Sequence, residues 1–227
     1  TAIMLKGDAV QSFTMLFLEM WAVNQMEPAD CQNYLTPKHV VPDPPHGYVI
    51  PYGDHPYDNE NVGEEVYFHI LNHSKKYVHI MTPYLILDSE MITALTRAAK
   101  SGIEVIIIMP HIPDKWYAFV LAHTYYKELI QAGVSIYEYT PGFVHAKVFV
   151  SDDDTATVGT INLDYRSLYL HFECGAYIYD HPVVADIEQD FQETLKKCQK
   201  ISLTEVENRP VTYKVMGQIL RLIAPLM

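Results

Sequence analysis

The sequence predicts an α/β fold, a layered α/β/α sandwich with a mixed, largely parallel central sheet. Two observations lead to this prediction. From residue 63 onward, short apolar segments alternate with segments whose apolar residues recur at helical spacing. One short segment, "IEVIIIMP" at 103–110, is apolar almost throughout, which is typical of a strand buried on both faces. Such strands belong to sheets that helices cover on both sides.

The first part of the chain contains one expected helix and one irregular stretch. Residues 9–26 place apolar side chains at helical spacing, so we expect a helix with Trp21 and its neighbours in the core. Residues 27–61 are polar and hold six prolines between Pro28 and Pro51, so they cannot form one regular element. We treat residues 1–227 as a single domain with this irregular segment inside it.

The alternating part follows. Asp88 or Ser89 caps one of the expected helices, and Gly102 ends it. Helices are expected at 63–74, 88–102, 115–131 and 183–199, and strands at 76–84, 103–110, 134–139, 143–152, 154–160 and 172–180.

The tail "YKVMGQILRLIAPLM" forms a further apolar stripe at helical spacing. Met216, Ile219, Leu220 and Ile223 share one side of this expected helix. Packing in the core or against another half of a larger protein is the favoured interpretation. A helix that faces a membrane surface is the alternative.

Composition excludes some classes of protein. The chain has 16 Lys and Arg against 28 Asp and Glu, a formal charge of -12, which argues against a nucleic-acid binder with a basic surface. A local basic pocket stays compatible with this charge. Cys31, Cys174 and Cys198 are odd in number and lack metal-ligand spacing, which indicates reduced thiols in a cytosolic setting. No apolar run reaches the ~18 residues of a membrane span. The first residue, Thr1, predicts a chain that is processed or cut from something longer.

The stretch "FVHAKVFVSD" at 143–152 carries the strongest chemical signal. His145 and Lys147 are two residues apart on an expected strand, so their side chains point to the same face. Asp152, "GTIN" at 159–162 and Glu173 follow, which gives the pattern H-x-K-x4-D-x6-G-T-x-N with a glutamate eleven residues after the asparagine. Each residue alone is ordinary, but their combination is specific.

This combination suits chemistry on a phosphate ester. A fixed cation and neighbouring amide or hydroxyl donors can hold phosphoryl oxygens while a neutral imidazole attacks phosphorus or a protonated one acts as an acid. A carboxylate can hold the other ring nitrogen and fix the tautomer.

The same residues resemble a known family. "HAKVFVSD" followed by "GTIN" resembles the HKD motif of the phospholipase D superfamily. "TPYLILDSEMITALTRAAKSGIEVIIIMP", "NLDYRSLYLHFE" and "RLIAPLM" resemble the carboxy-terminal half of bacterial cardiolipin synthases. That family carries two HKD motifs per chain, whereas the nearest second match, "HSK" at His73, has Ile80 where the aspartate is expected. The resemblance therefore implies a carboxy-terminal half without its partner half.

The resemblance also implies a reaction. Two phosphatidylglycerol molecules would yield cardiolipin and glycerol through a covalent phosphohistidine, with no metal or cofactor. One motif's histidine attacks phosphorus and the other's protonates the leaving alcohol; either role stays open for His145. Glu173 would accept a hydrogen bond from the far nitrogen of His145.

The remaining roles implied by the resemblance concern the phosphate and the fold. Lys147 and Asn162 would bind the phosphoryl oxygens, with Thr160 near them. Asp152 belongs to the catalytic motif, and we expect its carboxylate to serve a structural purpose away from the phosphate.

Two flanking segments are candidates for lipid contact. Tyr84, at the end of a strand, would line the lipid entrance or pack. His111 and Lys115 follow the next strand and would neighbour the lipid phosphate, with an exposed loop as the favoured alternative.

The implied partners are phosphatidylglycerol, a membrane surface and either the missing amino-terminal half or a second copy of the chain; no nucleic acid is expected. The implied location is the bacterial cell membrane, with the catalytic domain on the cytoplasmic side and this segment itself soluble.

Two other functions stay open. A single-motif phosphodiesterase, of phospholipase or nuclease type, would complete its site as a homodimer. A non-catalytic half would only bind phospholipid or another protein. The acidic composition and "NLDYRSLYL" argue against a nuclease, and the intact His145, Lys147, Asn162 and Glu173 argue against a non-catalytic half.

Overall fold

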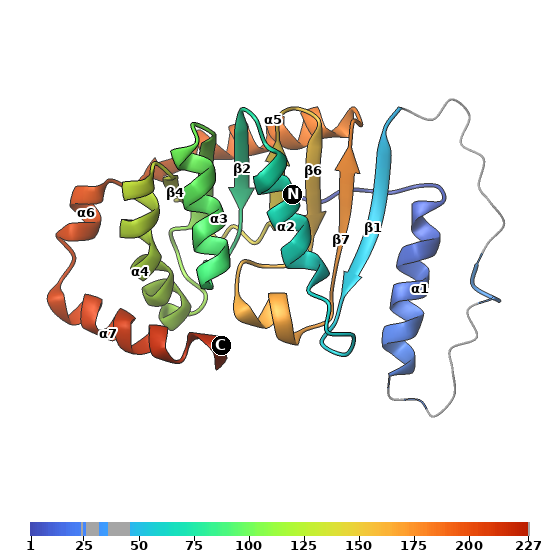
Figure 1. The fold of residues 1–227 in the computed structure, drawn as a ribbon, viewed down its shortest axis with the longest axis horizontal. Coiled ribbons are helices and arrows are strands. Elements are labelled where there is room, and N and C mark those ends of the chain that lie inside the picture. Colours follow the sequence, from blue (N-terminus) through green and yellow to red (C-terminus); the bar gives the residue numbers. More distant parts are fainter. Residues whose placement is uncertain (24, 26–31, 36–45, 227) are drawn as a thin grey trace.

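The computed structural model describes residues 1–23, 25, 32–35 and 46–226 (Figure 1). The helices are α1 (Ala9–Ala22), α2 (Val62–His73), α3 (Ser89–Lys100), α4 (Trp116–Ala132), α5 (Val183–Leu195), α6 (Leu203–Glu207) and α7 (Val211–Leu222), with a π-helical turn η1 (Arg166–Leu170) and a 3₁₀ turn η2 (Ala224–Leu226). The strands are β1 (Tyr48–Asp54), β2 (Tyr77–Met81), β3 (Glu104–Pro110), β4 (Ser135–Tyr139), β5 (Val148–Ser151), β6 (Thr155–Gly159), β7 (Glu173–Tyr179) and β8 (Cys198–Lys200).

The strands of the described residues form one mixed sheet in the order β1-β7-β6-β5-β2-β3-β4-β8. Only the pairs β2–β3 and β3–β4 are parallel, and the other described pairs are antiparallel. A mixed sheet is confirmed, but the prediction that it is largely parallel is wrong. Among the described strands, helices join neighbours in the sheet only at β2–β3 and β3–β4, whereas β5 turns directly into β6 through Asp152 and Asp153. These two residues have φ of 55° and 66°, as a type I′ hairpin turn requires.

Helices cover both faces of the sheet, which confirms the α/β/α layers. In Figure 1, α2, α3 and α4 lie over one face and α5 over the other. Strand β3 shows why both faces need cover: Ile107 and Ile108 point to opposite faces, and each is fully buried in a different hydrophobic cluster. Asp88 caps α3 by accepting a hydrogen bond from the Met91 amide at 2.7 Å, as the sequence predicted.

Several expected boundaries differ. The strand expected at 143–152 begins only at Val148, so His145 and Lys147 lie in an extended segment before β5. The helix expected to reach residue 199 ends at Leu195, and the chain then forms the edge strand β8. Strand β1 lies inside the stretch expected to be irregular, most of whose other residues, including Cys31, lie outside the described part.

Helix α1 contradicts the prediction that its apolar residues are core. None of its described residues is buried, and Trp21 is 65 % exposed. The helix lies beside β1, at the edge of the sheet far from α7 (Figure 1), where Leu16 occupies the space next to Gly53. The apolar side of α1 therefore packs mainly on the edge strand β1, which does not bury it.

Helix α7 packs closely on α4. A Cβ atom on Gly217 would lie 2.6 Å from Cγ2 of Thr124, so the absence of a side chain allows this approach. Leu220 is buried beside this contact. Among the described helices, none is both long and apolar enough to cross a bilayer.

Candidate active site

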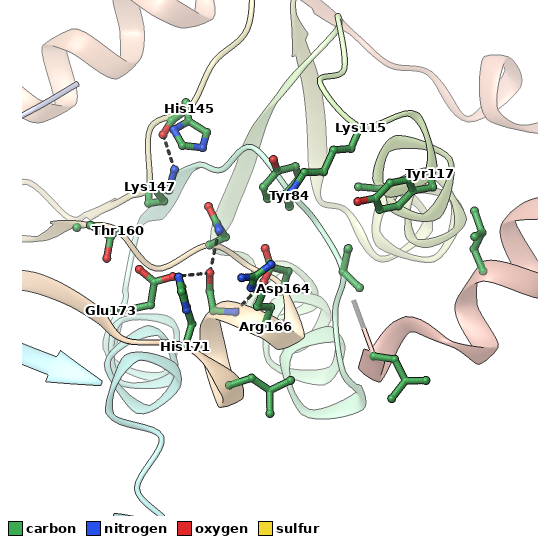
Figure 2. A pocket seen from close by; sticks show the side chains of 18 of the residues that line it. Tyr84, Lys115, Tyr117, His145, Lys147, Thr160, Asp164, Arg166, His171 and Glu173 are labelled. Atoms are coloured by element: carbon green, nitrogen blue, oxygen red, sulfur yellow. Dashed lines mark hydrogen bonds between the residues drawn. The ribbon is translucent and has the colours of Figure 1, made fainter. Parts of the chain in front are cut away.

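A large open pocket lies where the segments after β2, β3 and β6 meet η1 and the end of α7 (Figure 2). Its volume is about 1130 Å³. It combines cationic, anionic and aromatic side chains, and the labelled residues in Figure 2 are Tyr84, Lys115, Tyr117, His145, Lys147, Thr160, Asp164, Arg166, His171 and Glu173.

His145 presents an exposed imidazole to this pocket. Its ring stacks on Phe143 with centroids 5.6 Å apart, and its backbone oxygen accepts a hydrogen bond from Lys147 Nζ at 2.8 Å. Partial burial and the positive charges of Lys147 and Lys115 lower the pKa of His145, against an opposing effect of Asp114. The imidazole is therefore mainly neutral at pH 7, the form that can attack an electrophile.

Lys147 supplies a half-buried cation on the same side of the pocket. Burial lowers the pKa of its ammonium to about 8, although the nearby carboxylates of Glu173 and Asp164 oppose this shift. The side chain remains mostly charged at pH 7. An ammonium that has already lost part of its hydration is well placed to hold an anionic oxygen.

Asn162, Ser167 and Glu173 all line the pocket and form a hydrogen-bonded chain. Asn162 Nδ2 donates to Ser167 Oγ at 2.8 Å, and this hydroxyl donates to Glu173 Oε1 at 2.9 Å. Within the described residues, Oδ1 of Asn162 is buried without a hydrogen-bond partner. The chain fixes the amide and the carboxylate relative to each other.

Glu173 does not make the hydrogen bond to His145 that the sequence analysis expected. Its carboxylate accepts from Ser167, and no hydrogen bond reaches the His145 ring from any described residue. Both side chains nevertheless line the same pocket. The role of Ser167 as the partner of Glu173 could not be predicted from the sequence, because Ser167 lies on η1 and the position of η1 depends on the pairing of β6 with β7.

Thr160 lies at the edge of the pocket and is tied to β7. Its hydroxyl accepts from the Cys174 amide at 3.0 Å, and its own amide donates to the Cys174 oxygen at 2.9 Å. A Cβ on the preceding Gly159 would lie 2.4 Å from that oxygen, so glycine lets the two strands meet at this point. The "GT" of the motif therefore has a local structural cause.

Asp152 lies outside the pocket, beside the start of β2. Its carboxylate accepts hydrogen bonds from the backbone amides of Lys75, Lys76 and Tyr77 at 2.5, 2.9 and 3.0 Å. These contacts join the β5–β6 turn to the strand that carries Tyr84 toward the site. The geometry is that of a structural carboxylate.

Of the residues proposed for lipid contact, Tyr84 and Lys115 line the pocket and His111 does not. Tyr84 lines the pocket, donates to Asp114 at 2.6 Å and lies under the Lys115 ammonium, 5.1 Å from its ring centroid. His111 instead hydrogen-bonds to the buried Glu138 at 2.8 Å and is not among the lining residues.

Arg166 and His171 are lining residues that the sequence analysis did not single out. Both lie between Asn162 and Glu173, so any fold that brings those two together must also bring this segment near the site. Arg166 adds a third cation to Lys115 and Lys147. The lining thus holds three cations and two carboxylates, Asp164 and Glu173, in a chain of formal charge -12.

The α/β/α layers thus carry a pocket that brings His145, Lys147 and Glu173 together. Comparison with known proteins names the class: residues 67–195 match the family described as "Cardiolipin synthase, PLD-like domain", and the chain belongs to this family.

Curated relatives and a solved structure agree with this assignment. The chain is 52 % identical to an uncharacterized protein of Streptococcus mutans over 100 % of its own length and 49 % of the relative's. It is 35 % identical to cardiolipin synthase 2 of Bacillus anthracis, over 100 % of the chain and 44 % of the relative. It therefore spans about half the length of these relatives.

In fold, the chain resembles a phosphatidylserine synthase of Haemophilus influenzae, with a TM-score of 0.65 at 18 % identity. The likeness covers 82 % of this chain and 49 % of that one, and it supports the fold alone.

Proposed function

We propose that this chain supplies one of the two histidine-containing halves of a phosphatidyltransferase that makes cardiolipin and glycerol from two phosphatidylglycerol molecules. The convergence of His145, Lys147 and Asn162 on one pocket carries this proposal. Family membership and the identity to a cardiolipin synthase support the choice of reaction.

The proposed reaction has two steps. A histidine nitrogen attacks the phosphorus of the first lipid, the bond from phosphorus to the glycerol head-group oxygen breaks, and a second histidine protonates that oxygen. A glycerol hydroxyl of the second lipid then attacks the phosphohistidine, giving up its proton to the second histidine as the P–N bond breaks. His145 takes one of these two positions, and a histidine of another half takes the other.

The surrounding residues would stabilise the negative charge that the phosphoryl oxygens carry in the transition state. Lys147 and Arg166 would face the phosphoryl oxygens as cations, and the Asn162 amide is held in place by Ser167. Glu173 would act through Ser167 as a positioning residue, since it accepts that hydroxyl's hydrogen bond.

Cardiolipin formation from phosphatidylglycerol in detergent micelles tests the proposal. The chain is assayed over a wide range of concentrations, with H145A as the variant and circular dichroism as the check on folding. Activity that rises faster than linearly with concentration and is lost in H145A means that two copies assemble one site. Equal activity in H145A contradicts the proposal.

A chain that needs its partner half for turnover is inactive alone, but its binding of the lipid can still be measured. Short-chain phosphatidylglycerol below its micelle concentration should shift the NMR signals of His145 and Thr160, and K147M should weaken this binding. Absence of any shift in the pocket contradicts the proposal.

A further inference from the structure

Helix α7 exposes an apolar stripe that runs along its outer side. Val211, Val215, Ile219 and Leu222 are spaced by four, four and three residues and are 73, 53, 53 and 83 % exposed. The opposite side of the helix, with Gly217 and Leu220, packs on α4. The stripe therefore has no partner among the described residues.

The carboxy-terminal end of α7 and the turn after it reach the pocket. Leu220, from the same helix, lines the pocket, as does Leu226 of the following turn, which is 84 % exposed. Trp116, at the start of α4, also lines the pocket and is 61 % exposed. Two exposed apolar residues, Trp116 and Leu226, thus line the pocket, and Leu226 follows closely after Leu222, the last residue of the stripe. An exposed tryptophan is typical of groups that lie at a lipid–water boundary.

The charge of this part of the chain differs from that of the whole. From Arg209 to the end there are three cations, including Lys214 and Arg221, and no Asp or Glu, although the chain has 28 acidic residues against 16 basic ones. Lys115 adds a cation at the pocket mouth. Within α7 itself the charged residues are Lys214, which donates to the Glu207 backbone oxygen, and Arg221, which lies over the Tyr125 ring. The helix therefore carries positive charge and no carboxylate, which complements an anionic surface.

We propose that the α7 stripe docks on an anionic phospholipid surface and holds the pocket mouth against it. This inference rests on the proposed function, because a lipid substrate must reach the pocket from a bilayer. Helix α1 is the contrasting case: it lies at the other edge of the sheet and contains Glu19, and its exposed Phe17 and Trp21 do not line the pocket.

Vesicle flotation at low ionic strength tests the docking. Vesicles of phosphatidylglycerol and phosphatidylcholine are compared with vesicles of phosphatidylcholine alone. The whole chain should float with the anionic vesicles, and I219S/L222S should reduce its partition coefficient by about tenfold, because two exposed aliphatic side chains no longer enter the lipid. K214Q should reduce it by about fivefold.

The matched control is F17S/W21S on α1, which removes two apolar side chains that are 53 and 65 % exposed. Its partition should stay within about twofold of the unchanged chain. Loss of flotation in this control but not in I219S/L222S overturns the proposal. Equal binding to neutral and anionic vesicles also overturns it. A third refuting outcome is that I219S/L222S changes the chain from dimer to monomer while its flotation stays unchanged.

Short-chain phosphatidylglycerol in solution separates this inference from the proposed function. I219S/L222S should bind the soluble lipid as well as the unchanged chain does, since neither residue lines the pocket. Soluble-lipid binding without flotation overturns the docking and leaves the proposed function standing. Flotation that depends on α7 without binding of the soluble lipid overturns the proposed function and leaves the docking standing.

Discussion

Asp152 offers the sharpest test of structural against chemical roles, because it belongs to the HKD motif but lies away from the pocket. D152N keeps the shape of the side chain and tolerates the φ of 55°. It removes the charge and leaves one acceptor oxygen for three amides, those of Lys75, Lys76 and Tyr77. Three charge-assisted bonds of about 1.5 kcal/mol become at most two neutral ones of about 1 kcal/mol, a loss of about 2.5 kcal/mol.

This loss is measured by urea unfolding and by thermal melting. A change of about 2.5 kcal/mol lowers the melting temperature by roughly 5 to 10 °C for a chain of this size. D153N is the matched control: its φ is 66°, and its Oδ1 can still accept the Tyr77 hydroxyl. We expect little change in it and unchanged affinity for short-chain phosphatidylglycerol in both variants. Unchanged stability of D152N with affinity reduced as far as in K147M would refute a structural role.

Three further predictions concern the site, a buried carboxyl and helix packing. K147M should raise the pKa of His145 toward its usual value, because the ammonium opposes imidazole protonation; an unchanged NMR titration contradicts this. Burial and the neighbouring Asp88 raise the pKa of Glu64 from 4.5 to about 7, so the folded state binds the proton more tightly and stability falls as pH rises from about 4.5 through 7. E64Q keeps an acceptor for Tyr169 and should flatten this slope in urea unfolding between those pH values. G217V should destabilise by about 2 kcal/mol through the contact with Thr124, whereas Q218V on the exposed side should not.

The sequence identified most of the candidate-site residues because they occur at a characteristic spacing along the chain. His145, Lys147, Asn162 and Glu173 form one combined motif, and the fold brings all of them to the pocket. The sequence could not supply Ser167 as the link between Asn162 and Glu173. That link depends on a π-helical turn whose position is set by strands that pair across the chain.

The sequence by itself determined the alternation of helices and strands, the cap at Asp88 and the residue types available to hold a phosphate, because these are local patterns. Only the tertiary structure decided the strand order, since backbone pairing between distant segments leaves no local trace. It also decided that α1 and one side of α7 stay exposed. Apolar periodicity shows that a helix has a face to cover, but what covers it depends on which elements the rest of the chain brings alongside.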